Sequence, residues 1–94
     1  MRILAERLKQ LRAEKDLSME ELVADMNNRF HPEKPLNRSM VSRWESGDND
    51  PTLEKAKLLS EYFDVSLDYL IGLSDVRTPS RVLTMKKKGE NHDD

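Results

Sequence analysis

Apolar residues recur at intervals of three or four positions along most of the chain, which is the spacing of amphipathic helices. The pattern predicts five helices, at about residues 1–15, 19–28, 38–46, 53–63 and 67–71. No segment shows the strict alternation of apolar and polar residues that is typical of a half-buried strand. We therefore expect an all-α fold in which five short helices form one compact bundle.

Residue types that start and stop helices support these limits. Ser18 and Glu21 have the spacing of a capping box, in which a hydroxyl and a carboxylate each bind the other residue's backbone amide. Side chains that favour the N-cap position precede the last three helices, at Asn37, Thr52 and Ser66. Gly47 and Gly72 follow two of the helices and favour their ends. The predicted helices thus rest on periodicity and on capping together.

Beyond Leu73 the sequence becomes rich in Pro, Ser, Lys and Asp, a composition typical of chain that does not pack into a core. We therefore assign residues 1–75 to one folded domain and residues 76–94 to a flexible or dimer-assisting tail. Within that tail a short apolar patch is formed by Val82, Leu83 and Met85.

The 94 residues include no cysteine and two histidines, His31 and His92. Without cysteine, neither a disulfide framework nor a thiolate metal site can form, and His31 beside Glu33 offers too few ligands for a metal. No apolar run approaches the roughly 20 residues that cross a membrane. The N-terminal segment mixes charges throughout, unlike a secretion signal. We expect a cytoplasmic protein that has no metal, no cofactor and no membrane segment, and that is not an enzyme.

The formal net charge is −2 at pH 7, whereas domains that bind nucleic acid usually carry a basic surplus. Acidic residues concentrate in residues 48–75, where seven carboxylates accompany two lysines. Composition alone therefore does not indicate a nucleic-acid partner, and any signal for one has to come from the placement of particular side chains.

The predicted helix at residues 38–46 carries the most informative pattern. At 100° per residue its apolar side holds Met40, Val41 and Trp44, and its opposite arc holds Arg38, Ser39, Ser42 and Arg43. We expect the apolar side to pack inward, Trp44 included. The opposite arc presents guanidinium and hydroxyl groups, which can read base edges in a DNA major groove. The plainer interpretation of the same arc is a solvated helix surface.

Three stretches of the chain together resemble the lambda-repressor-like (Cro-type) helix-turn-helix DNA-binding family. They are RLKQLRAEKDLSMEELV, LNRSMVSRWESG and PTLEKAKLLSEYFDVSLDYLIG, in this order between Arg7 and Leu73. Their order is more specific than any one of them. The resemblance implies that the second helix crosses the DNA backbone and that the third, the recognition helix, enters the major groove.

The resemblance also implies roles for individual residues. Those expected to face the bases are Asn37, Arg38, Ser39, Ser42 and Arg43. Those expected near phosphates are Ser18, Met19, Arg29, Lys34 and Ser46. Arg12 and Glu45 would form a structural ion pair that ties the first helix to the third. For Ser39 and Ser42, a role as plain polar surface residues is an equal alternative.

Two features depart from the family pattern. About nine residues separate Asn28 from Arg38, whereas the turn of a helix-turn-helix usually has three or four. Either the second helix runs longer, or the insertion forms an extra loop that carries Arg29, Phe30 and Lys34. Carboxylates that phosphates would repel also lie close to the expected interface, at Glu20, Asp48 and Asp50.

Apolar side chains left over from the predicted core indicate an interface between two copies of the chain. Leu58 and Tyr62 project away from the expected inward face of the 53–63 helix, which consists of Leu53, Ala56, Leu59 and Phe63. Tyr69 likewise points away from the inward face of the last helix. We predict Leu58, Tyr62 and Tyr69 in a homodimer interface; the alternative is that they are scattered exposed residues. Two recognition helices would then lie about 34–36 Å apart.

We therefore expect a bacterial or phage-type (prophage) transcriptional regulator, most simply a repressor, which binds a near-palindromic operator on double-stranded DNA as a homodimer. The tail at residues 76–94 would be too short for an effector domain, so repression would act by blocking polymerase. The alternative is an antitoxin-like or anti-repressor-linked module that binds a regulatory protein partner through the acidic residues 48–75, with DNA binding secondary.

Overall fold

The computed structural model describes residues 1–79. They form five helices, in the order α1 (Arg2–Glu14), α2 (Met19–Phe30), α3 (Arg38–Ser46), α4 (Leu53–Phe63) and α5 (Leu67–Ile71). No strand occurs in this part of the chain. The expected all-α, five-helix architecture is therefore confirmed. The limits differ from the predicted ones in that α1 is one residue shorter at each end and α2 two residues longer.

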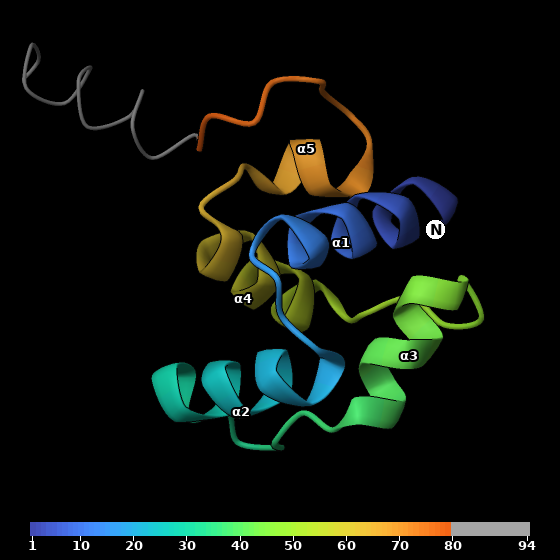
Figure 1. Cartoon of the computed structure of the whole chain (residues 1–94). Coiled ribbons are helices and arrows are strands. Elements are labelled where there is room, and N and C mark those ends of the chain that lie inside the picture. Colours follow the sequence, from blue (N-terminus) through green and yellow to red (C-terminus); the bar gives the residue numbers. More distant parts are fainter. Residues whose placement is uncertain (80–94) are drawn as a thin grey trace, which may run out of the picture.

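The first helix lies across the middle of the molecule, with α5 on one side and the α2–α3 pair on the other (Figure 1). α1 packs against α3 and α5, α2 packs against α3 and α4, and α4 packs against α5. α2 and α3 therefore form one end of the bundle, and the loop that joins them runs along the outside of that end (Figure 1).

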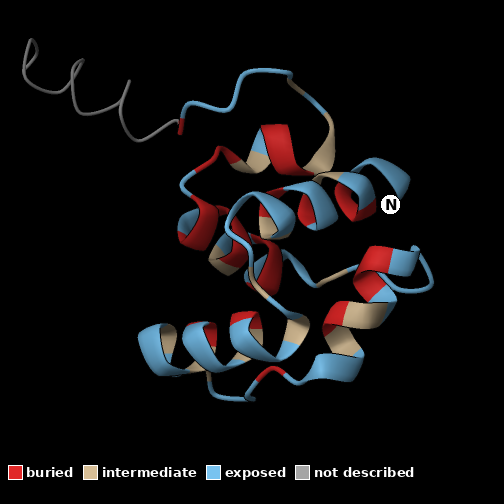
Figure 2. Ribbon diagram, viewed as in Figure 1, coloured by how far each residue is buried: buried red, intermediate tan, exposed pale blue. Residues whose placement is uncertain are grey.

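All five helices contribute to one core. The most deeply buried large side chains, at 1% exposure or less, are Leu4, Leu8, Leu22, Met26, Val41, Leu59 and Leu70. Figure 2 shows the buried positions on the facing sides of the helices and the exposed positions on their outer sides. Trp44 is 4% exposed and joins the core from α3, as its place on the apolar side of that helix predicts.

Side-chain caps begin the last four helices. At the start of α2, Ser18 Oγ accepts a hydrogen bond from Glu21 N at 3.0 Å, and Ser18 N donates to Glu21 Oε1 at 2.8 Å, which completes the capping box. The caps expected at the other three helices are present at Asn37, Thr52 and Ser66. Gly47 and Gly72 follow α3 and α5 at φ of 84° and 94°, a left-handed conformation that costs glycine little.

The insertion before α3 combines both predicted alternatives. α2 extends through Arg29 to Phe30, so these two residues are helical. His31 then ends the helix in a left-handed conformation, at φ 48°. The remaining residues, 31–37, form a loop that carries Lys34. α2 and α3, the two helices of the expected helix-turn-helix, which we call the recognition-motif helices, are thus joined by a longer connection than the usual short turn.

Two side chains hold the 31–37 loop in place. The side-chain amide of Asn27 makes two hydrogen bonds with the backbone of Leu36. Asn27 Nδ2 donates to the Leu36 carbonyl at 3.0 Å, and Leu36 N donates to Asn27 Oδ1 at 2.9 Å. From α4, the buried Lys55 donates from Nζ to the Lys34 carbonyl at 3.1 Å. Leu36 itself is 3% exposed. The loop is therefore tied to α2, to α4 and to the core.

Two of the three residues predicted for a dimer interface do not project outward. Tyr62 and Tyr69 are each 7% exposed, so that expectation is wrong for both. Tyr62 turns toward α2, where its hydroxyl donates to Asp25 Oδ2 at 2.6 Å, and a satisfied hydroxyl lets a tyrosine ring join a core. Leu58 is half-buried at the edge of the core. Leu53, predicted to face inward, is 69% exposed at the first turn of α4.

Tyr69 is buried because two guanidinium groups cover its ring. The Arg7 Cζ atom lies 4.1 Å from the ring centroid and the Arg77 Cζ atom 5.3 Å from it. Arg77 also donates to both carboxylate oxygens of Glu14, at 3.0 and 2.8 Å. These hydrogen bonds lower the pKa of Glu14 and raise that of Arg77.

The start of the predicted tail packs on the domain. Ser66 N donates to the Arg77 carbonyl at 2.9 Å, and Ser66 Oγ donates to the Val76 carbonyl at 3.2 Å. Arg7 holds the preceding residues through the Ser74 carbonyl, at 2.7 Å, and the Asp75 carboxylate, at 2.9 Å. Val76 and Arg77, at the start of the predicted tail, therefore contact the domain. Val82, Leu83 and Met85 lie outside the described residues.

Candidate nucleic-acid interface

The third helix has an inner and an outer side. It buries Val41, Trp44 and Glu45. On its other side, Arg38, Ser39 and Arg43 are exposed and Ser42 is half-buried, while Asn37 is exposed just before the first turn. The structure therefore gathers the five residues that the sequence predicts to face bases on one outward surface, which we call the recognition face: Asn37, Arg38, Ser39, Ser42 and Arg43.

The position of α3 is fixed by an ion pair with α1. Arg12 donates from Nε to Glu45 Oε2 at 2.7 Å and from Nη2 to Glu45 Oε1 at 2.9 Å. Its remaining amino group donates to the Leu17 carbonyl at 2.7 Å. The Glu45 side chain is 3% exposed, and its hydrogen bonds raise the pKa of Arg12. The pair expected from the family resemblance is thus present, and it also anchors the chain that leads into α2.

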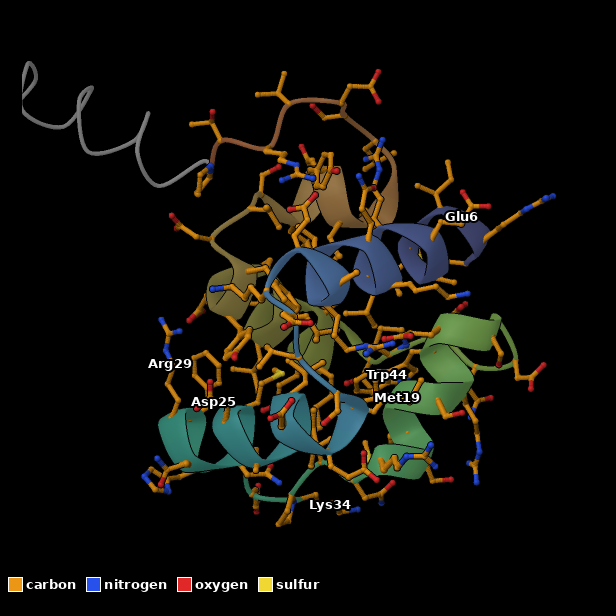
Figure 3. All side chains as sticks on the ribbon, viewed as in Figure 1. Glu6, Met19, Asp25, Arg29, Lys34 and Trp44 are labelled. Atoms are coloured by element: carbon orange, nitrogen blue, oxygen red, sulfur yellow. The ribbon has the colours of Figure 1, made fainter. Side chains whose placement is uncertain are left out.

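Apolar contacts complete the joint between α2 and α3. Trp44 points from α3 toward the beginning of α2, close to Met19 (Figure 3). Met19 is half-buried and packs against the core, as does Met40 on α3. The side chain of Met19 is therefore engaged in packing, and its backbone amide is the group that remains for a ligand.

The first turn of α2 presents unpaired backbone amides. Ser18 and Glu21 satisfy each other through the capping box. Within residues 1–79, the amides of Met19 and Glu20 have no hydrogen-bond acceptor, as is usual for the first residues of a helix. Such amides and the positive end of the helix dipole attract anions.

A second ion pair links the two helices at this surface. Glu20 Oε2 lies 3.2 Å from Arg38 Nε, and the two side chains are 69% and 62% exposed. Glu20 is in the first turn of α2 and Arg38 in the first turn of α3. The sequence places the carboxylate of Glu20 near the expected interface but indicates no partner for it, because no periodicity relates two residues on either side of a loop.

The remaining residues predicted near phosphates are only partly gathered. Lys34 lies on the 31–37 loop at the α2–α3 end of the molecule, whereas Arg29 projects from the far end of α2 toward α4 (Figure 3). Its Cζ atom is 5.7 Å from the centroid of the Tyr62 ring. Ser46 is exposed, but its hydroxyl already donates to the Arg43 carbonyl at 3.1 Å. Arg29 is therefore separated from the recognition face.

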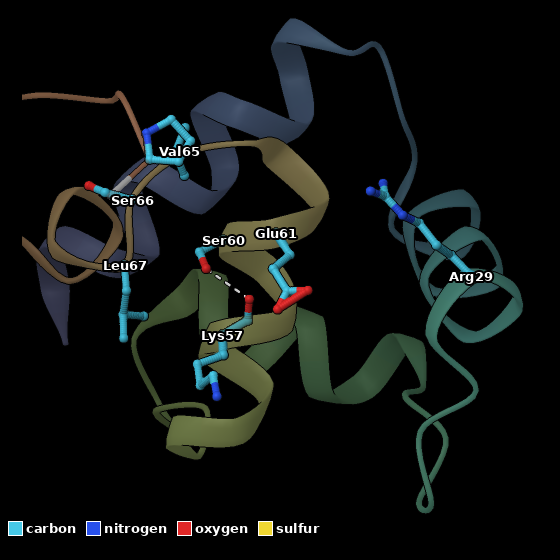
Figure 4. A pocket seen from close by; sticks show the side chains of 8 residues that line it. Arg29, Lys57, Ser60, Glu61, Val65, Ser66 and Leu67 are labelled. Carbon is cyan, nitrogen blue, oxygen red and sulfur yellow. Dashed lines mark hydrogen bonds between the residues drawn. The ribbon is translucent and has the colours of Figure 1, made fainter. Parts of the chain in front are cut away.

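A concavity on another side of the molecule contains none of these residues except Arg29. It lies among α2, α4 and the α4–α5 connection and is lined by Arg29, Lys57, Ser60, Glu61, Val65, Ser66, Leu67 and Pro79 (Figure 4). The hydroxyl of Ser60 donates to the Lys57 carbonyl at 2.8 Å, so it is engaged within α4. None of the lining residues belongs to α3.

Two other kinds of feature are absent from residues 1–79. Within the described part of the chain, no group of three or more His, Cys, Asp and Glu side chains lies close enough together to hold a metal ion. In the same part of the chain, none of the helices has the length and apolar character that crossing a membrane requires.

Comparison with known proteins gives one family and two relatives. The family described as "Helix-turn-helix" matches residues 8–70. The HTH-type transcriptional activator BcrR of Enterococcus faecalis is 33% identical over 73 residues, which are 78% of this chain and 32% of that protein. YobD of Bacillus subtilis (strain 168), described as an uncharacterized HTH-type transcriptional regulator, is 32% identical over 74 residues, which are 79% of this chain and 59% of YobD.

The chain therefore spans about a third of one of these relatives and less than two thirds of the other. No solved structure gives a significant match.

Proposed function

Because the chain belongs to the helix-turn-helix family of transcriptional regulators that its sequence resembles, we propose that it binds double-stranded DNA in a sequence-specific manner through α3. The observation that carries the proposal is the recognition face. Arg38, Ser39 and Arg43 are exposed on it, while Trp44 and Glu45 hold the opposite side of the helix in the domain. Donors on a rigid helix are what readout of a major groove requires.

Individual residues of the recognition face have distinct roles in this proposal. Arg38 and Arg43 bind guanine O6 and N7, each contact giving about 1–3 kcal/mol of discrimination against other bases. Asn37 uses Oδ1 to cap the Met40 amide at 2.9 Å, which leaves its Nδ2 group for DNA. Ser39 and Ser42 donate to bases or phosphates and carry less sequence information.

The phosphate contacts come from the elements around α3. The free amides of Met19 and Glu20 bind a backbone phosphate at the start of α2. Lys34 on the 31–37 loop and Ser46 after the recognition face flank that contact. Ser18 contributes by holding the first turn of α2 in shape, and Arg29 reaches only phosphates beyond the far end of α2.

The proposal extends to assembly and outcome. Two copies bind a near-palindromic operator as a homodimer in the bacterial cytoplasm and repress transcription by blocking polymerase. Repression needs only DNA occupancy, which is why we choose it over activation. Leu58, which is half-buried, is the member of the predicted interface that stays partly accessible, since Tyr62 and Tyr69 are in the core.

Selection from a randomised duplex library tests this function, followed by salt titration of the enriched duplex against a scrambled one. We expect the enriched duplex to bind more tightly, with the linear log–log salt dependence of phosphate contacts. Arg38→Ala and Arg43→Ala should each weaken binding to the enriched duplex about fivefold to a hundredfold and relax selectivity at one position.

Lys57→Ala is the matched control, because Lys57 is exposed on α4 and lines the concavity on another side of the molecule, which contains no residue of α3. It should change binding by less than about twofold, as for a distant screened charge. Equal weak binding to every duplex, with no effect of Arg38→Ala or Arg43→Ala, would contradict the proposal. A reporter gene placed behind the enriched site distinguishes repression from activation.

A further inference from the structure

The ion pair between Glu20 and Arg38 lies where the proposed function places DNA. Glu20 Oε2 is 3.2 Å from Arg38 Nε, and both side chains are more than half exposed. Exposed pairs of this kind contribute little to the stability of a fold, because water and salt screen them. Its position at the junction of the two recognition-motif helices therefore calls for another explanation.

Neither residue is free to move away from the other by a shift of its backbone. The first turn of α2 is held by the Ser18–Glu21 capping box, and that of α3 by the Asn37 cap. The Arg12–Glu45 pair and the packing of Trp44 fix α3 against the rest of the bundle. Glu20 and Arg38 thus face each other as a consequence of the fold.

The pair engages a particular atom of the guanidinium group. Glu20 is next to Nε, which is the nitrogen nearest the aliphatic stem. Within residues 1–79, neither Nη amino group of Arg38 donates a hydrogen bond. These two amino groups form the tip of the guanidinium group. A pair of donors in this position can bind the two acceptors of a guanine, O6 and N7.

The carboxylate also changes the balance between two ways of binding DNA. On an unrelated sequence, Arg38 would turn to a phosphate, and in doing so it would leave Glu20 unpaired beside a second negative charge. On a site with guanine at the matching position, Arg38 keeps Glu20 on Nε and binds the base through its Nη groups. Glu20 therefore weakens mainly the binding of DNA that lacks the matching guanine.

We propose that Glu20 is a specificity-determining residue of the DNA interface, which holds Arg38 in an end-on orientation for guanine and disfavours its contact with phosphate. This inference rests on the proposed function of α3. It assigns to Glu20 a positioning role that acts through Arg38, and it accounts for an acidic side chain on a surface that approaches a polyanion.

The experiment measures two dissociation constants for each variant, one for the library-enriched duplex and one for the same duplex with the site scrambled. Glu20→Gln removes the charge and keeps the length of the side chain. We expect it to tighten binding to the scrambled duplex about threefold to fivefold and to change binding to the enriched duplex by less than about twofold. The salt slope on the scrambled duplex should steepen by about one phosphate contact.

Two further variants separate the proposed role from a general effect of charge. In the Arg38→Ala background, Glu20→Gln should shift both dissociation constants by the same factor, so the specificity ratio stays constant. Asp68→Asn is the matched control, because Asp68 is also an exposed carboxylate at the second position of its helix, α5, outside the α2–α3 pair. It should leave the ratio unchanged. Circular dichroism checks that every variant retains its helices.

Three outcomes would overturn the inference. Equal tightening on both duplexes by Glu20→Gln alone would mean that Glu20 only repels phosphate. A change in the specificity ratio that persists without Arg38 would mean that Glu20 acts through another group. If the unaltered chain enriches no duplex at all, the proposed function fails, and this inference fails with it; in the first two cases the proposed function stands.

Discussion

At the residue scale, the ion pair between Arg12 and Glu45 is mostly buried. The Glu45 side chain is 3% exposed and that of Arg12 is 19% exposed. Removing one partner of a buried pair leaves the other charge without compensation, at a cost of about 3–5 kcal/mol. We expect Arg12→Ala to lower the free energy of unfolding by about 3 kcal/mol, measured by urea denaturation.

Arg2→Ala provides the comparison for this prediction, since Arg2 pairs with Glu6 at 3.6 Å but is 91% exposed. An exposed pair contributes less than about 1 kcal/mol. If the two variants were destabilised equally, the Arg12–Glu45 pair would have no special structural role.

Tyr62 makes the free energy of unfolding depend on pH in the alkaline range. Burial and, after it, the hydrogen bond to Asp25 raise the pKa of Tyr62 to about 12. In the unfolded chain a tyrosine ionises near a pKa of about 10. Because the pKa is higher in the folded state, the contribution of the neutral phenol is complete below about pH 10 and is lost as the pH rises toward 12.

We therefore expect the free energy of unfolding to fall between about pH 10 and pH 12, and Tyr62→Phe to flatten that part of the curve. At neutral pH the same substitution should cost about 1 kcal/mol for the lost hydrogen bond. Unfolding measured by circular dichroism over this pH range checks both expectations. Identical curves for the two proteins would refute the assignment to Tyr62.

At the scale of elements, the 31–37 loop depends on one side chain of α2. Asn27 binds both the amide and the carbonyl of Leu36. Asn27→Ala would leave both groups without that partner, and we expect it to lower the free energy of unfolding by about 1–3 kcal/mol. Asn28→Ala, at the neighbouring exposed position of the same helix, should change it by less than about 0.5 kcal/mol. Urea denaturation of both variants distinguishes a held loop from one that merely crosses the surface.

The elements also differ in how well local sequence predicts them. Helices and their caps depend on residues three or four positions apart, so the periodicity, Ser18 and Asn37 were sufficient to predict them. The face of α4 that points inward depends on a partner elsewhere, since Tyr62 is buried with its hydroxyl on Asp25. A projection of the isolated helix cannot contain that information.

The candidate site likewise has features that local sequence predicts and features that it does not. The recognition face lies within one helix and follows from its period, whereas the Glu20–Arg38 pair and the hold of Asn27 on Leu36 join segments across a loop of variable length. The placement of residues 76–79 also depends on partners far away in the chain, although the composition beyond Leu73 indicates a free tail. Arg77 nevertheless binds Glu14 on α1, 63 positions earlier, and no local pattern predicts such a partner.

At the scale of the whole molecule, the proposed homodimer makes the spacing of its half-sites a test. Two recognition helices on one face of DNA lie one helical turn apart, about 34–36 Å. An insertion of about five base pairs between the half-sites turns one of them to the opposite face, so we expect affinity to fall about a hundredfold. An insertion of about ten base pairs restores the common face and should recover part of the loss. Equal affinity for all three duplexes, measured by fluorescence anisotropy, would indicate binding as a monomer.

The position of Trp44 also determines how this protein can be observed. It is the single tryptophan of the chain, it is 4% exposed, and it lies behind the recognition face. Its emission therefore reports on an apolar interior, and it should shift to longer wavelength when that interior opens to water. DNA on the outer side of α3 would leave the indole without a base to quench it. The intrinsic fluorescence can thus follow unfolding during a DNA titration without an attached dye, and strong quenching by DNA would mean that α3 had turned out of the bundle.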